Sequence, residues 1–210
     1  AIIEEINQNE SCHILTIEDP VEFVYKPARS IISQREVGKD TKGWQTALRS
    51  ALRSDPDVVL VGEMRDFETI ALTLTLAETG HLVFATLHTN TSAQTIDRII
   101  DVFPSYQQDQ VRQQLSSVLQ AIVSQRLVPK INGGRVAAVE LLVNTQAVAN
   151  LIREKKVFQI DGVMQTSASA GMVLLENSLL DMYHQKVISK ETALARAFRP
   201  NEMMRLLDET

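Results

Sequence analysis

The chain has 210 residues, of which 44% are hydrophobic and 22% are charged, a composition that suits a globular protein rather than a disordered one. Its net charge of −5, without a long basic block, gives no support for nucleic-acid binding through general electrostatics. A single cysteine excludes disulfides within the chain, and the scattered histidines argue against a Cys/His metal cluster. No apolar run approaches the roughly 18 residues of a membrane-spanning helix, so we expect a globular cytosolic protein.

The first part of the chain alternates between helical and strand patterns. Apolar residues at positions 2, 3 and 6 predict the second half of a helix, which indicates that the chain is a fragment. Short apolar runs predict strands at residues 13–17, 30–33, 58–61 and 82–86. Helices are predicted at residues 43–54, at 67–78 with Asp66 as N-cap, and from Thr91 or Ser92 to a point before Pro104. A further helix is predicted to begin at Ser105 and to present Val111, Leu115, Val118, Leu119 and Ile122 as its apolar positions.

The pattern changes after residue 131. A turn at residues 132–134 is followed by a predicted strand at 135–143 and then by helices at about 145–155, 171–186, 190–198 and 201–208, with Ser189 and Asn201 as caps. Short links between the earlier strands and helices favour a mostly parallel sheet covered on both faces. We therefore expect an α/β core over residues 1–143, followed by an all-helical subdomain over residues 144–210.

Polar side chains stand next to several predicted strands. They are Glu18, Asp19 and Glu22 after the first strand, Glu63 after the third, and His81 and His88 on either side of the fourth. Because ligands of open α/β sheets bind beyond the carboxyl ends of the strands, we interpret these residues as one site. Carboxylates in such a site can hold Mg²⁺ directly or through water, and one can orient an attacking water in phosphoryl transfer.

Each residue also has a plainer interpretation. Glu63 by itself is consistent with the start of a solvated loop, and residues 18–20 with a turn. His81, which follows a helix, could satisfy the end of that helix. Arg98 and Arg126 are consistent with surface charges. The chain also lacks the phosphate-loop pattern G-x-x-x-x-G-K-[ST], so spacing alone leaves a nucleotide site without the loop that holds the phosphates.

Three segments together resemble motifs of the secretion-type hexameric ATPases. Residues 14–23 (ILTIEDPVEF) resemble the aspartate box, residues 55–63 (DPDVVLVGE) a variant Walker B motif with glycine before the glutamate, and residues 79–90 (TGHLVFATLHTN) the histidine box. They follow the family's order, and the similarity runs through nearly the whole chain. Residues 147–154 (AVANLIRE) and the helical tail are similar to the pilus-retraction branch, although Val148 and Ala149 depart from its motif. The extension and type II secretion branches usually carry a four-cysteine zinc element, and residues 127–140 contain no cysteine.

The resemblance implies a RecA-like P-loop NTPase core, whose phosphate loop is expected upstream of Ala1, and the cofactors ATP and Mg²⁺. It implies that Glu63 is the catalytic base and makes two arginines candidates for stabilising charge, Arg98 and Arg126. The residues expected to support the nucleotide and Mg²⁺ site are Glu18, Asp19, Glu22, His81 and His88. Without the phosphate loop, these 210 residues alone are expected to bind ATP weakly or not at all.

The function that follows from the resemblance is a motor for type IV pilus retraction and twitching motility. It implies a homo-hexameric ring that hydrolyses ATP at subunit interfaces and acts on an inner-membrane platform protein. The expected location is the cytoplasmic face of the bacterial inner membrane, without a membrane span and without a nucleic-acid partner. The alternatives are a pilus-extension or type II secretion ATPase, or a non-hydrolytic relative that acts as a regulator or scaffold.

Overall fold

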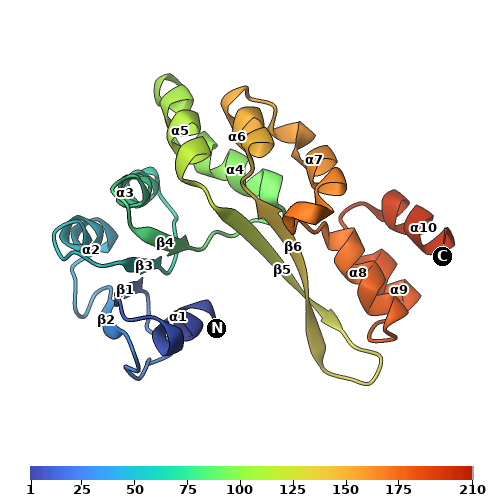
Figure 1. Cartoon of the computed structure of the whole chain (residues 1–210), viewed down its shortest axis with the longest axis horizontal. Helices are drawn as coiled ribbons and strands as arrows, with labels where there is room; N and C mark the ends of the chain where they lie inside the picture. The colour runs from blue at the N-terminus through green and yellow to red at the C-terminus, as the bar shows by residue number, and fades with distance from the viewer. Residues whose placement is uncertain (210) are drawn as a thin grey trace. The chain divides into compact units, whose positions relative to one another are not determined.

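The computed structural model describes residues 1–209, which form two compact units (Figure 1). The first unit comprises residues 1–88 and 102–104, and the second comprises residues 89–101 and the chain from residue 105 onward. The predicted boundary at residues 143/144 therefore falls inside the second unit. Within residues 1–209, no helix is both long and apolar enough to cross a membrane.

The first unit is built on a parallel sheet of four strands in the order β2-β1-β3-β4. Its elements are α1 (Ile2–Asn9), β1 (His13–Glu18), β2 (Ile31–Glu36), α2 (Trp44–Ala51), β3 (Val58–Val61), α3 (Phe67–Glu78) and β4 (Leu82–Ala85). In the register of the sheet, Ile14 pairs with Val58, and Val58 pairs with Leu82. The parallel α/β core predicted from the sequence is confirmed.

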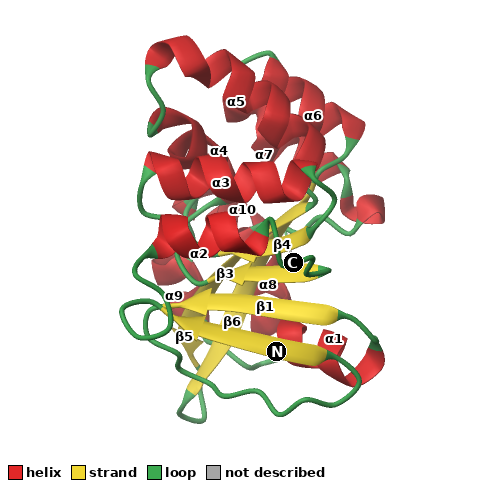
Figure 2. Cartoon of the chain, turned by 90° about the vertical axis from the view of Figure 1, so that its left-hand side faces the viewer, coloured by secondary structure: helices red, strands yellow, loops and turns green. Residues whose placement is uncertain are grey.

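Helices cover both faces of this sheet, and Figure 2 shows α2 and α3 above the strands. Leu15 and Val59 point to one face, where they pack in a cluster with Leu48 of α2 and other buried residues. Ile14, on the opposite face of β1, packs with Ile3 of α1. The alternation follows from the two-residue period of a strand, which sends neighbouring side chains to opposite faces. In the middle of the sheet, β3 is mostly buried and its sequence is continuously apolar, whereas the edge strand β2 is partly polar and only partly buried.

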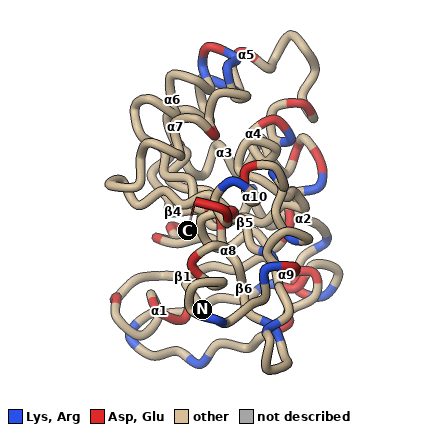
Figure 3. The backbone as a smooth tube through the Cα atoms, turned by 90° about the vertical axis from the view of Figure 1, so that its right-hand side faces the viewer, with Lys and Arg blue, Asp and Glu red and all other residues tan. Residues whose placement is uncertain are grey.

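The second unit combines a β-hairpin with helices. Its elements are α4 (Ser92–Asp101), α5 (Ser105–Val118), β5 (Ala121–Pro129), β6 (Arg135–Val143), α6 (Gln146–Arg153), α7 (Ile160–Thr166), α8 (Leu175–His184), α9 (Lys190–Arg196) and α10 (Pro200–Asp208), with short 3₁₀ turns at Val157–Gln159 and Ala168–Ala170. β5 and β6 pair antiparallel. Val128 of β5 packs with Leu179 of α8 and Met203 of α10. Figure 3 shows acidic and basic residues interspersed along both units.

The helix predicted to extend to Ile122 is wrong, because α5 ends at Val118 and Ile122 lies in β5. The side chain of Asn144 explains the stop. Its Nδ2 donates to the carbonyl oxygens of Ser116 at 3.1 Å and Leu119 at 2.8 Å, which satisfies two acceptors near the end of the helix. Ile122 is buried, as an inward-facing residue of a strand rather than of a helix.

Two further differences concern the C-terminal helices. The helical pattern predicts no helix over α7, and the cap predicted at Asn201 is wrong because α10 begins at Pro200. Proline suits this first helical position, since its fixed backbone angle is helical and its missing N–H has no partner there. The cap predicted at Ser189 is confirmed, because its side chain accepts a hydrogen bond from the N–H of Thr192.

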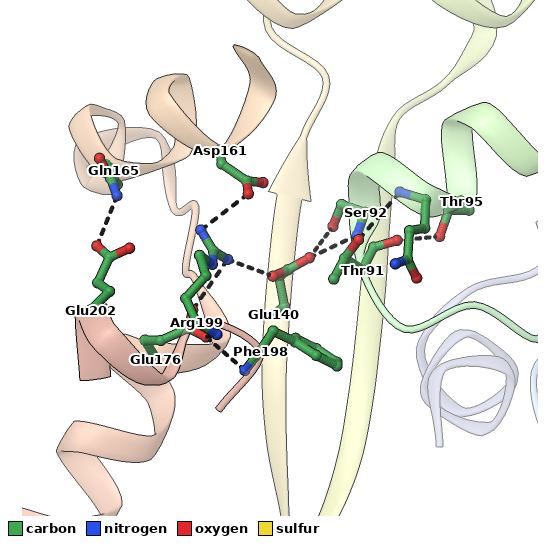
Figure 4. Close-up of polar contacts among 11 residues, drawn as sticks. Thr91, Ser92, Thr95, Glu140, Asp161, Gln165, Glu176, Phe198, Arg199 and Glu202 are labelled. Carbon is green, nitrogen blue, oxygen red and sulfur yellow. Dashed lines mark hydrogen bonds and ion pairs between the residues drawn. The ribbon is translucent and has the colours of Figure 1, made fainter. Parts of the chain in front are cut away.

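A buried ion-pair network organises the second unit (Figure 4). The guanidinium of Arg199 lies 3.1 Å from Glu176, 3.2 Å from Asp161 and 3.6 Å from Glu140. Glu140 and Glu176 are fully buried. The other oxygen of Glu140 accepts hydrogen bonds from the N–H and hydroxyl of Ser92 at 2.7 and 2.9 Å. One arginine thus joins β6, α7 and α8, and through Glu140 the first turn of α4.

Candidate active site at the carboxyl edge of the parallel sheet

Gly62 lies where the end of β3 meets β1. Its N–H donates to the carbonyl of Ile17 at 2.8 Å, and a Cβ at this position would lie 3.1 Å from that oxygen and 3.3 Å from Cα of Glu18. Both atoms belong to the backbone, so this close approach requires a residue without a side chain. On the other side, the hydroxyl of Thr86 donates to the Gly62 carbonyl, and the N–H of Met64 donates to the Thr86 carbonyl. The loop after β3 is therefore tied to both neighbouring strands.

Glu63 follows immediately, and two basic side chains hold its carboxylate. Its Oε2 lies 2.6 Å from Nη2 of Arg65, and its Oε1 lies 2.9 Å from Nε2 of His88. The Glu63 side chain is 19% exposed, whereas those of Arg65 and His88 are mostly exposed. The hydrogen bond from Arg65 is the main reason why the pKa of Glu63 is lowered, and the charges of Arg65 and His88 add to it. Glu63 is thus an oriented and ionised carboxylate.

Glu18 is the last residue of β1, beside Gly62 in the sheet. Its Oε1 accepts hydrogen bonds from the hydroxyl of Thr16 at 2.6 Å and from the amide of Gln34 at 3.0 Å. Asp19 is exposed, and its charge contributes, after Glu63, to the raised pKa of Arg65. Glu18, Asp19, Glu63 and His88 therefore gather at the carboxyl edge as predicted, while Glu22 is exposed in the loop after β1.

His81 does not belong to this group. It precedes β4, so it lies at the amino edge of the sheet, roughly 13 Å along the strand from the carboxyl end at ~3.3 Å per residue. Its Nδ1 is 3.0 Å from the carbonyl of Leu76 and 3.1 Å from the hydroxyl of Thr79. The plainer interpretation is the one observed, since His81 satisfies a carbonyl at the end of α3.

The two candidate arginines lie in the second unit. Arg126 donates from Nη1 to the carbonyl of Arg196 at 2.8 Å, and its guanidinium stacks 4.1 Å from the centre of the Phe198 ring. These contacts tie β5 to the segment between α9 and α10. Arg98 is exposed on α4.

The carboxylates at the carboxyl edge suit a cation that is shared with a bound nucleotide, rather than a metal site made of protein ligands alone. In the part of the chain described here, no three His, Cys, Asp or Glu side chains gather as a metal site. Both oxygens of Glu63 are occupied by Arg65 and His88, whereas Oε2 of Glu18 has no protein partner within residues 1–209 and Asp19 is exposed. Mg²⁺ commonly takes one or two carboxylates together with waters and substrate phosphates, and Glu18 and Asp19 fit that donor set.

The comparisons with known proteins agree on the family. The family model described as type II/IV secretion system protein matches residues 1–205. The chain belongs to this family. It is 52% identical over 95% of its length to the type IV pilus retraction ATPase PilT of Pseudomonas aeruginosa, and 52% identical over 97% to a twitching motility protein of Neisseria gonorrhoeae. A crystal structure of the pilus retraction motor PilT with bound ADP matches 97% of the chain and 58% of that structure, with a TM-score of 0.91 and 53% identity.

The chain spans 58% and 54% of the lengths of these two relatives. Membership of the type II/IV secretion system family establishes the RecA-like class of the fold. It leaves open what each residue of the site does, and there the geometry adds two side chains that sequence reasoning missed. These are Arg65, which lies two residues beyond the acid that it holds, and Gln34, which reaches Glu18 from the neighbouring strand.

Proposed function

We propose that the protein is an ATP-hydrolysing motor for type IV pilus retraction. The observation that carries the proposal is the oriented, ionised carboxylate of Glu63 at the carboxyl edge of the sheet, held by Arg65 and His88. This arrangement occurs in a chain that is 52% identical to a pilus retraction ATPase. The crystal structure of PilT with bound ADP further supports nucleotide binding by a protein with this fold.

The residues at the carboxyl edge suggest a division of labour. Glu63 would orient the attacking water and accept its proton, because it is ionised and fixed by two partners. Glu18 and Asp19 would hold Mg²⁺ directly or through water, and that ion would neutralise the charge of the phosphates. Glu22 is assigned a supporting role in the same site. His88 contacts Glu63 and would couple the nucleotide state at Glu63 to the segment that follows His88 in the chain.

The wider assignments rest on the relatives. We propose that residues 1–143 act as the ATPase core and residues 144–210 as its C-terminal subdomain. A homo-hexameric ring, an inner-membrane platform partner and a place at the cytoplasmic face of the inner membrane are the corresponding proposals for the intact protein. His81 and Arg126 enter only as residues whose effect would act through helix and hairpin packing. Arg98, exposed on α4, is proposed only as a candidate stabilising charge in the intact protein.

The first prediction concerns Glu63→Gln in the intact protein. The amide cannot accept a proton from water, so we expect kcat for ATP hydrolysis to fall roughly a hundredfold or more. Nucleotide binding should be retained because the fold does not depend on this side chain. Phosphate release under saturating Mg·ATP measures the effect, with Glu10→Gln, an exposed glutamate after α1, as the matched control.

Two outcomes would reject the proposal. Hydrolysis at the normal rate by Glu63→Gln would show that another group activates the water. Absence of hydrolysis in the unsubstituted intact protein would favour a regulator or scaffold that shares the fold.

A further inference from the structure

The loop between β1 and β2, residues 19–30, contains no helix or strand, and we call it the acid loop because it carries Asp19 and Glu22. Side chains from outside the loop bind its backbone. Asn7 of α1, which is fully buried, donates to the carbonyl of Lys26 at 2.9 Å and accepts from the N–H of Ala28 at 3.0 Å. Such bonds replace those of regular secondary structure, so the acid loop is held in place.

Gln34 makes the central set of these bonds. Its Nε2 donates to Oε1 of Glu18 at 3.0 Å and to the carbonyl of Phe23 at 2.9 Å. Its Oε1 accepts from the N–H of Tyr25 at 2.9 Å. Both N–H groups and the oxygen of one amide are therefore in use, and they join the end of β1 to two points of the acid loop.

The register of the sheet explains why Gln34 reaches this position. Gln34 lies beside Thr16 in the parallel pairing of β1 and β2, and Glu18 lies beside Glu36, one strand period further along. Thr16 donates to the same oxygen of Glu18 that Gln34 binds. Glu36 accepts from the N–H of Val21 at 3.3 Å, which adds a third anchor for the acid loop.

We propose that Gln34 is a positioning residue of the nucleotide site, and that its amide fixes the Glu18 carboxylate and the acid loop in a single arrangement. The inference deepens the proposed ATPase function and rests on it. Only an amide can donate twice and accept once at this position. A glutamate would place a second negative charge beside Glu18, and a methionine would keep the volume but lose all three bonds.

Activity tests the proposal through Gln34→Met in the intact protein. We expect kcat/KM for Mg·ATP to fall on the order of tenfold to a hundredfold, because catalytic groups displaced by about 1 Å lose that much. Gln34→Glu should be at least as damaging. Gln8→Met is the matched control, since Gln8 also binds a glutamate, Glu4, but on the exposed surface of α1.

A double-variant comparison shows whether Gln34 acts through Glu18. Adding Gln34→Met to Glu18→Ala should cost less than twofold, because the carboxylate that Gln34 orients is already gone. If Gln34→Met lowers kcat/KM by as much in the Glu18→Ala variant as it does by itself, the proposal is overturned.

Two measurements do not depend on hydrolysis. In Gln34→Met, the amide of Tyr25 should exchange hydrogen at least tenfold faster, while the amides of β1 and β3 keep their rates. Burial, followed by the charges of Glu18 and Glu4, raises the pKa of the Tyr25 phenol, so release of the acid loop should move that pKa back toward 10.0. NMR of ¹³C-labelled tyrosine separates Tyr25 from Tyr106 and Tyr183.

The outcomes separate the two levels of the proposal. Unchanged exchange and an unchanged Tyr25 titration would show that Gln34 holds nothing in place. A loosened loop with unchanged kcat/KM would show that the bonds are structural only, which also overturns the proposal. If the unsubstituted intact protein hydrolyses no ATP, the proposed function fails, and exchange and titration still decide whether Gln34 fixes Glu18 and the loop.

Discussion

At the scale of single residues, Gly62 sets how closely β3 approaches β1. In Gly62→Ala the new methyl group would meet the Ile17 carbonyl at 3.1 Å, so the strand end must shift. Overpacking of this kind costs about 1–3 kcal/mol of the free energy of unfolding. Urea unfolding followed by the fluorescence of Trp44, the only tryptophan, measures the change. Gly43→Ala, which meets nothing within 4 Å, is the control, and equal stability of the two variants would contradict the prediction.

Arg65 should set the acid limit of activity through Glu63. The pKa of Glu63 is lowered, so its active, ionised form persists to lower pH than that of an ordinary glutamate. Arg65→Gln removes the largest cause, so the pKa rises and the acid limb of the kcat/KM profile moves to higher pH. Arg49→Gln, an exposed arginine of α2, should leave the profile in place. If the acid limb of the kcat/KM profile does not move in Arg65→Gln, a group other than Glu63 sets that limb.

At the scale of elements, local patterns predict what local forces determine. The strands β1 and β3 are largely buried, so each shows an apolar run that the sequence reveals. β4 shows the same kind of run, although its side chains are only partly buried. The cap at Asp66 is equally local, since its carboxylate accepts from the N–H of Thr69 at 2.9 Å. The end of α5 is different, because it depends on Asn144, which lies 25 residues beyond Leu119.

The same distinction applies to the site. Glu18, Glu63 and His88 were predictable because each lies at or just beyond the carboxyl end of a strand. His81 was misplaced because it lies beside β4 in sequence but at the opposite end of that strand. Gln34 could not be predicted, because its contact with Glu18 depends on the register between β1 and β2. Pairing register between separate strands is not encoded in any short window of residues.

At the scale of the whole molecule, one arginine balances the buried charge of the second unit. Arg199 is the basic partner of Glu140 and Glu176, whose side chains are at most 1% exposed. Arg199→Met keeps an apolar stem but leaves two buried carboxylates without a cation, and removing one partner of a buried pair typically costs 3–5 kcal/mol. Because the Arg199 side chain is itself 24% exposed, we expect a loss near the lower limit, about 3 kcal/mol.

The loss should be confined to the second unit, and this makes the prediction specific. Hydrogen exchange followed by mass spectrometry should show faster exchange in β6, α8 and α10, whereas unfolding reported by Trp44 of the first unit should shift less. Arg205→Met is the matched control on α10, because its ion pair with Glu209 is 3.9 Å long and both side chains are mostly exposed. Equal effects of Arg199→Met and Arg205→Met would show that the buried network contributes no more than a surface pair. If the Trp44 unfolding midpoint fell by a free energy as large as the loss measured by exchange in the second unit, the two units would instead unfold together.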